Sequence, residues 1–279
     1  MKADLHLHST ASDGTLAPDE LVLRAAQEGF ELIALTDHDS VSGVAQAQQA
    51  AKASGVRLIP GVELSCGADK EIHILGYGVD VQNEALLAFS AARRAERVER
   101  AREMVRRLGE NGAPVSFERV CEMARGMIGR PHVARALLEA GHVNSIPEAF
   151  ERYLTPGKCA YVPREKIEVA QAVRMIRAAG GAAVLAHPME LKKGEMALTA
   201  LVGEWKSQGL EGIEVYHPSA QNNHAAFLLS LARSEGMLVT GGSDFHGENV
   251  RDSRLGDTLE RWRDVQADTQ RLLERLKMK

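Results

Sequence analysis

The chain has 279 residues, a net charge of −4 and a charged fraction of 26%. This mildly acidic balance argues against a protein that coats nucleic acid or a membrane surface, and no apolar run approaches the ~18 residues that span a bilayer. Its three cysteines, Cys66, Cys121 and Cys159, are odd in number and widely spaced, as is typical of reduced thiols. The N-terminus runs straight into a histidine-bearing segment, without a signal peptide. We therefore expect a cytoplasmic protein without a membrane or an obligate protein partner.

Apolar strand patterns alternate with helical patterns along most of the chain. In chain order the sequence predicts a strand at 3–8, a helix at 18–29, a strand at 30–39, a helix at 44–55, strands at 56–66 and 70–79, a helix at 84–109, a helix at 167–179, a strand at 182–188, a helix near 198–208, a strand at 212–218, a helix ending at 236, a strand at 237–247 and a helix from about 257. Repeated βα units favour a parallel, barrel-like sheet.

One stretch interrupts this alternation. Residues 112–164 carry five prolines between short helical pieces. We interpret the stretch as an inserted helical cap, so that residues 1–111 and 165–279 form the barrel domain.

Histidines and carboxylates gather where the predicted strands end. His6 and His8 lie two apart and share one face of their strand. Several buried charges on one rim are costly unless metals neutralise the carboxylates and occupy the imidazoles, and the C-terminal ends of barrel strands are where active sites lie. The candidate ligands are His6, His8, Asp13, His38, Glu63, His73, His187, Asp244 and His246. Nine ligands exceed the needs of one tetrahedral ion, so we expect two or three metals.

The segments HLHSTASDGT, LTDHD, GVELS, HILGYG, LAHP and GGSDFHG, in this order, resemble the polymerase and histidinol phosphatase (PHP) family of metal-dependent phosphoesterases. The resemblance covers nearly the whole chain. It implies a distorted barrel of seven βα units with a two- or three-metal centre, with manganese favoured and iron or zinc as alternatives. It also implies three ligand sets: His6, His8, Glu63 and Asp244; Glu63, His73 and His187, with Glu63 shared; and Asp13, His38 and His246.

Two segments of the insert, GRPHVARAL (129–137) and YLTPGKCAYVP (153–163), resemble a stand-alone bacterial group within this family. Members remove the 3′-phosphate from nucleoside 3′,5′-bisphosphates, and some trim short RNA from its 5′ end. The resemblance implies hydrolysis to a nucleoside 5′-monophosphate and phosphate by a metal-bridging hydroxide, with Glu63 and Asp244 as catalytic residues.

A bisphosphate substrate also needs groups that bind its second phosphate. Candidates in the insert are Arg130, Arg135, Lys158 and Arg164, and Phe245 is placed to stack on a base. His217, at the end of another strand, is a candidate to bind a phosphate or protonate the leaving 3′-oxygen. Packing against Pro218 is an equally open alternative for it.

Other functions remain open at this stage. The same barrel would serve a histidinol-phosphate phosphatase or another small-molecule phosphomonoesterase, and related barrels hydrolyse C–N bonds. A non-catalytic metal-binding module is less favoured, because all nine candidate ligands are present. The chain has neither a GxSxG motif nor a P-loop, which gives no support for a serine nucleophile or for ATP hydrolysis.

Overall fold

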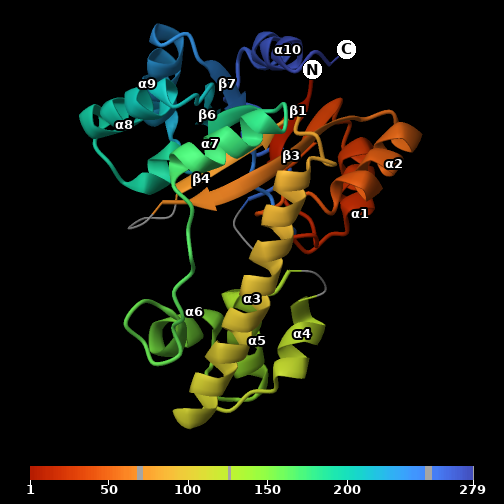
Figure 1. Cartoon of the computed structure of the whole chain (residues 1–279). Helices are drawn as coiled ribbons and strands as arrows, with labels where there is room; N and C mark the ends of the chain where they lie inside the picture. Colours follow the sequence, from red (N-terminus) through yellow and green to blue (C-terminus); the bar gives the residue numbers. More distant parts are fainter. Residues whose placement is uncertain (68–71, 125–126, 249–252, 279) are drawn as a thin grey trace. The chain divides into compact units, whose positions relative to one another are not determined.

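The computed structural model describes residues 1–67, 72–124, 127–248 and 253–278 (Figure 1). The chain divides into a barrel unit, Met1–Ala88 with Lys166–Lys279, and a helical insert, Phe89–Glu165. The insert begins at Phe89 rather than at residue 112 because most of the long helix α3 (Glu84–Glu110) belongs to it, whereas the sequence pattern assigned that helix to the barrel.

The barrel unit is built on one sheet whose seven strands follow one another in chain order. The strands are β1 (Ala3–Leu7), β2 (Leu32–Leu35), β3 (Arg57–Cys66), β4 (Ile72–Tyr77), β5 (Ala182–Leu185), β6 (Gly212–Tyr216) and β7 (Leu238–Gly241). Neighbours pair in parallel except at β4, which is antiparallel to both β3 and β5. The expectation of a parallel sheet does not hold at this strand. The connection from β3 to β4 is too short for the helical crossover that a parallel pair requires.

The sheet curves until its first and last strands meet. Leu7 and Phe245 form a parallel bridge, and the backbone N–H of His8 donates to the carbonyl oxygen of Phe245 at 3.0 Å. The two edges approach so closely that a Cβ added to Gly242 would lie 2.3 Å from the Cβ of His6. Only glycine fits there, and the closure brings the histidines of β1 beside the segment that follows β7.

Helices surround these strands. Those of the barrel unit are α1 (Pro18–Gln27), α2 (Val44–Ser54), α7 (Val169–Ala178), α8 (Glu195–Ser207), α9 (Asn222–Ser234) and α10 (Val265–Arg275), with a 3₁₀ turn at Pro188–Leu191. Helices α1 and α2 pack together on one side of the strands, and α8 and α9 lie on the other (Figure 1). The strands β1, β2 and β5 are buried along their whole length, so the core lies between sheet and helices. No helix in the described ranges combines the length and apolarity needed to cross a membrane.

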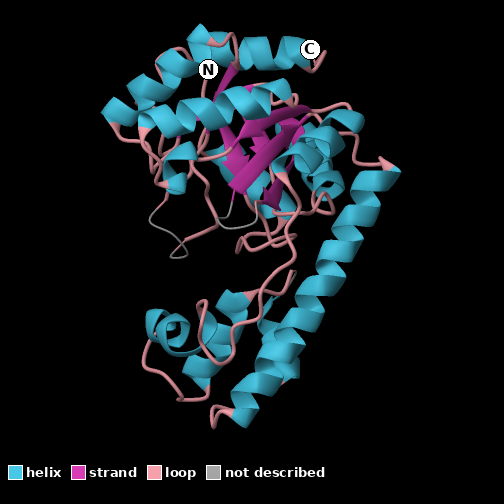
Figure 2. Cartoon of the chain, turned by 60° about the vertical axis from the view of Figure 1, so that its left-hand side comes forward, coloured by secondary structure: helices cyan, strands magenta, loops and turns pink. Residues whose placement is uncertain are grey.

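The insert consists of helices and loops in its described residues (Figure 2). Besides α3 it contains α4 (Phe117–Ala124), α5 (Arg130–Glu139), α6 (Ile146–Ala149) and a π-helical turn at Phe150–Leu154. It has its own core, in which α3 contributes Met104 and Leu108 and α5 contributes Val133 and Leu137. The prediction of an α/β fold, with a distorted seven-stranded barrel and an inserted small helical unit, is confirmed.

Candidate metal centre

The nine predicted ligands come together at one rim of the barrel. They arrive from β1 and the loop after it, from β3 and β4, and from the segments that follow β2, β5 and β7. Seven of them are buried, while the side chains of His73 and Asp13 retain 13% and 31% exposure. The strands place these residues at the rim because the other face of each strand packs into the apolar core.

The first group consists of His6, His8, Glu63 and Asp244, with one ligand atom from each lying within 4.8 Å of the others. The Nε2 atom of His6 lies 3.2 Å from Glu63 Oε2 and 3.4 Å from Asp244 Oδ1. The Nε2 atom of His8 lies 3.2 Å and 3.1 Å from the same two oxygens. This arrangement contains every member of the first ligand set implied by the family resemblance.

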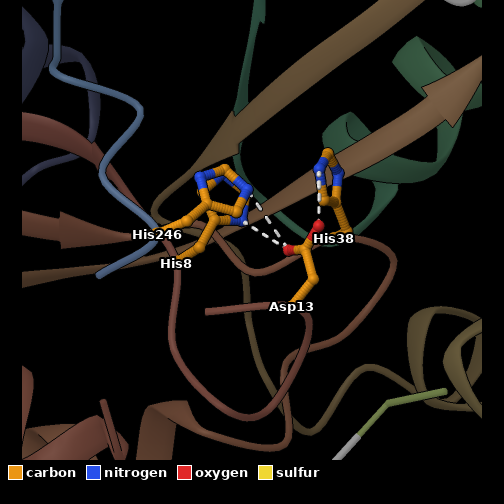
Figure 3. Close-up of side chains that lie close together, drawn as sticks. All are labelled: His8, Asp13, His38 and His246. Atoms are coloured by element: carbon orange, nitrogen blue, oxygen red, sulfur yellow. Dashed lines mark ion pairs between the residues drawn. The ribbon is translucent and has the colours of Figure 1, made fainter. Parts of the chain in front are cut away.

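The second group joins Asp13, His38 and His246, and the structure adds His8 to it. Figure 3 shows the rings of His8 and His246 stacked over each other and Asp13 facing both rings and His38. The centroids of the two stacked rings are 4.0 Å apart. Asp13 Oδ1 lies 3.3 Å from Nε2 of His246 and 3.8 Å from Nδ1 of His8. The two nitrogens of His8 therefore face different groups.

The third group surrounds the other oxygen of Glu63. Oε1 lies 2.9 Å from Nδ1 of His73 and 3.0 Å from Nε2 of His187. Oε2, which already faces His6 and His8, is also 3.1 Å from Nδ1 of His38. Glu63 thus stands between all three groups, as a shared ligand must.

The chemistry of these atoms fits divalent metals. Among the described residues, several inward-facing atoms are buried and have no hydrogen-bond partner, namely His6 Nε2, His8 Nε2, Asp13 Oδ1, His38 Nδ1, Glu63 Oε2 and His246 Nε2. Nitrogen lone pairs turned toward carboxylate oxygens at hydrogen-bond distance need a proton or a metal between them. Imidazole and carboxylate together suit Mn, Fe and Zn.

The carboxylates are held in the ionised form that a metal requires. Burial opposes ionisation of Glu63, but the imidazoles of His38, His73 and His6 outweigh it and hold its pKa well below the usual range. Burial likewise opposes ionisation of Asp13, and His38 and His246 lower the pKa of that group. For His38 burial dominates, which lowers its pKa and favours the neutral ring that binds metals.

Asp37 shapes the loop that carries Asp13, a role that sequence reasoning did not assign to it. Its Oδ1 accepts from the backbone N–H of Ser9 at 2.7 Å and from the hydroxyl of Ser12 at 2.6 Å, and its Oδ2 accepts from the hydroxyl of Ser9 at 2.7 Å. Burial raises the pKa of Asp37, against the lowering effect of His8 and the two serines. The available signal was a carboxylate at the end of one predicted strand together with two serines in the turn after another strand.

His217 borders a cavity of about 160 Å³ that Asp244, Glu190 and Ser219 also line. The backbone N–H of Ser219 donates to Nδ1 of His217 at 3.1 Å. Because an amide N–H can only donate, Nδ1 is the acceptor and the neutral ring carries its proton on Nε2. Nε2 lies 3.6 Å from Asp244 Oδ2 and is a buried atom without a hydrogen-bond partner among the described residues, so its N–H is available beside the metal groups.

In the insert, the candidate phosphate-binding residues separate into two kinds. Arg130 is partly buried, and its guanidinium carbon lies 5.9 Å from the ring centre of Phe150 and 6.0 Å from that of Tyr161. Arg164 is also partly buried. Arg135 and Lys158 are exposed and lie on different elements, α5 and the loop after the π-helical turn.

Sequence reasoning missed two arginines of α3 that join this region. Burial and the guanidiniums of Arg164, Arg97 and Arg130 lower the pKa of Arg100 to about 10, against the opposing effect of Glu96. Arg100 donates to the carbonyl oxygen of Val162 at 3.0 Å, which ties α3 to the segment that carries Arg164. We call Arg97, Arg100, Arg130 and Arg164 the arginine cluster. The periodic arginines of α3 were the signal for it.

Phe245 is buried at 5% exposure, and its backbone closes the barrel against β1. Little of its ring surface is left for a nucleobase, and stacking by Phe245 stays an untested prediction.

A seven-stranded distorted barrel with clustered His, Asp and Glu side chains at one rim is typical of a metal-dependent hydrolase of the PHP type. The PHP domain model matches residues 4–154, so the chain belongs to the PHP family of metal-dependent phosphoesterases, as its motifs predict. Among its relatives, a 3′,5′-nucleoside bisphosphate phosphatase of Chromobacterium violaceum is 39% identical over 255 residues, which cover 89% of each chain. A 5′-3′ exoribonuclease of Haemophilus influenzae is 37% identical and covers 88% of this chain and 90% of its own.

A solved structure supports the same assignment. The crystal structure of a metal-dependent phosphoesterase from Bifidobacterium adolescentis superimposes with a TM-score of 0.84 at 31% identity, covering 98% of this chain and 96% of its own. The predictions of family and of a phosphoester hydrolase are confirmed.

Proposed function

We propose that the protein hydrolyses the 3′-phosphate of nucleoside 3′,5′-bisphosphates such as adenosine 3′,5′-bisphosphate. The convergence of nine metal-ligating side chains at one rim carries the proposal, and the name of the Chromobacterium relative supports the choice of substrate. One water is consumed. Its oxygen joins the phosphorus, the bond from phosphorus to the ribose 3′-oxygen breaks, and that oxygen takes up a proton.

The metals would be held as the three groups suggest. His6, His8, Glu63 and Asp244 would hold one ion, Asp13, His38 and His246 with His8 beside them a second, and Glu63, His73 and His187 a third. Divalent ions bound in such groups lower the pKa of a water nucleophile and polarise phosphoryl oxygens. Manganese is our proposed metal, and metal analysis of protein purified without added metal distinguishes it from iron and zinc.

His217 acts on the substrate through its Nε2–H. The proton is fixed on that nitrogen by the N–H of Ser219, and the donor faces the cavity beside Asp244. A fixed donor suits a phosphoryl oxygen or the leaving 3′-oxygen, where negative charge develops during the reaction. Packing alone would not require a defined tautomer.

The second phosphate of the substrate would be recognised by basic side chains of the insert. Of the candidates, Arg130 and Arg164 belong to the arginine cluster, together with Arg97 and Arg100. Guanidinium groups form paired hydrogen bonds to phosphate oxygens, and an anion relieves the mutual repulsion of clustered arginines. Arg135 and Lys158 remain further candidates on exposed positions of the insert.

A second candidate activity is the removal of nucleotides from the 5′ end of short RNA. The exoribonuclease relative favours it at 37% identity, and the same chemistry of phosphoester hydrolysis would serve. A cytoplasmic location fits nucleotide substrates of either kind.

The test is phosphate release from adenosine 3′,5′-bisphosphate by manganese-loaded protein, with histidinol phosphate, 3′-AMP and a short 5′-phosphorylated RNA run in parallel. We expect the bisphosphate to be the preferred small molecule, with 5′-AMP as the product. A clear preference for histidinol phosphate, or the absence of metal-dependent phosphate release, would contradict the proposal.

A further inference from the structure

Strand β6 contributes a buried carboxylate that none of the ligand groups includes. Glu214 has no exposed surface and lies in the middle of β6, between Ile213 and Val215. Its Oε1 is 2.9 Å from Nδ1 of His6, and its Oε2 accepts from the backbone N–H of His187 at 2.7 Å. One carboxylate therefore contacts two of the predicted metal ligands, on either side of its own strand.

The contact with His6 determines which ring nitrogen is available to a metal. An ionised carboxylate can only accept hydrogen bonds, so Nδ1 of His6 must carry the proton and donate it. The lone pair then resides on Nε2, the atom that faces Glu63 Oε2 at 3.2 Å and Asp244 Oδ1 at 3.4 Å.

The contact with His187 holds an unusual backbone conformation. His187 has a φ of 25° and a ψ of 60°, in the region that residues other than glycine rarely adopt. Its N–H points at Glu214 Oε2, while its ring reaches Glu63 Oε1 at 3.0 Å. A strained position of this kind persists only where its surroundings fix it.

We propose that Glu214 is a positioning residue of the metal centre. Glu214 directs Nε2 of His6 toward the other residues of the first group, and it holds the backbone of His187 so that the ring of His187 reaches Glu63 in the third group. The inference rests on the proposed metal centre. Carboxylates that orient ligating histidines typically contribute 10–100-fold to metal affinity.

The first experiment is the variant Glu214→Gln. The N–H of His187 belongs to the backbone and cannot reverse, so the glutamine oxygen must stay on it and the amide NH₂ must face Nδ1 of His6. That donor forces the ring proton onto Nε2 and removes the lone pair from the metal site. We expect one zinc equivalent to bind about 10–100-fold more weakly in calorimetric titration of metal-free protein, with fewer metal atoms retained after dialysis.

The matched control is Asp4→Asn. Asp4 is also a fully buried carboxylate near the centre, but it accepts from backbone N–H groups, those of His6 at 3.3 Å, Ser243 at 2.9 Å and Gly256 at 2.8 Å, rather than from a ring nitrogen. We expect this variant to unfold more easily and still bind every zinc equivalent. Equal metal loss in both variants, or unchanged zinc affinity in Glu214→Gln, would overturn the proposal.

A measurement on the unaltered protein covers the case in which Glu214→Gln does not fold. In ¹⁵N-labelled, zinc-loaded protein, the imidazole spectrum of His6 should show a protonated, hydrogen-bonded Nδ1 and a metal-bound Nε2. A proton on Nε2 would refute the role of Glu214. Failure of the unaltered protein to bind zinc or manganese at all would instead refute the metal centre itself.

Discussion

Replacing Asp37 offers a quantitative test of how the loop from Ser9 to Gly14 is held in place. The carboxylate accepts three hydrogen bonds from Ser9 and Ser12, at 2.6 to 2.7 Å, and is 1% exposed. A hydrogen bond to a charged group contributes about 1.5–3 kcal/mol. Asp37→Ala removes all three acceptor contacts, and partial rehydration of the loop limits the loss. We expect a destabilisation of about 3–5 kcal/mol.

Asp37→Asn is the matched variant. The asparagine oxygen can keep the N–H of Ser9 and the hydroxyl of Ser12, and its NH₂ can donate to the hydroxyl of Ser9, which is able to accept. We therefore expect a loss of only about 1 kcal/mol. The measurement is urea unfolding in the presence of a chelator, which excludes metal binding from the comparison. Metal content after dialysis then reports whether the loop still places Asp13 at the metal centre. The reasoning fails if the two variants are equally stable, or if the alanine variant lies within 1 kcal/mol of the wild type.

Three further predictions test the metals, the insert and the closure of the barrel. Chelation should abolish phosphate release and lower the melting temperature, since metal at 100 times its Kd stabilises the fold by about 2.7 kcal/mol. Added manganese should restore both. A melting temperature that chelation leaves unchanged would argue against the metal centre. Arg100→Ala should raise KM for adenosine 3′,5′-bisphosphate by about 10–100-fold and leave hydrolysis of p-nitrophenyl phosphate nearly unchanged. A larger increase of KM in Arg135→Ala would instead assign the second phosphate of the substrate to the exposed face of α5. Gly242→Ala should cost about 1–3 kcal/mol in denaturant unfolding, because its Cβ would overlap His6, 2.3 Å away. A variant as stable as the wild type would show that the two edges of the barrel can separate.

The residues that gather at the candidate metal centre could be predicted from sequence because each stands at a recognisable place in a strand pattern. His6 and His8 share a strand face, and Asp244 and His246 follow the last apolar run directly. Residues near strand ends are positioned by the backbone itself, so a strand assignment already implies that they meet. The division of these residues into groups was harder to predict from sequence. His8 contributes to two groups, because its two ring nitrogens point in different directions.

Supporting residues could not be found in the same way. Glu214 reads as one polar residue in the apolar strand GIEVY, although a carboxylate between Ile213 and Val215 is costly unless it is paired. Arg97 and Arg100 lie in a helix with five other arginines, three of which, Arg94, Arg102 and Arg106, face solvent. In each case the role depends on a partner far away in the sequence, and only the folded chain identifies that partner.

The orientation of β4 explains how His73 reaches the same rim as the other ligands. In parallel strands the active rim lies at the C-terminal ends, and His187 and Asp244 both follow the ends of such strands. His73, by contrast, stands near the beginning of β4. Because β4 runs antiparallel to β3, its beginning lies at the end of β3, where His73 pairs with Ser65, two residues beyond Glu63. Reversing one strand thus places a candidate ligand near its start at the common edge. The short connection from β3 to β4, visible in the sequence, requires that reversal.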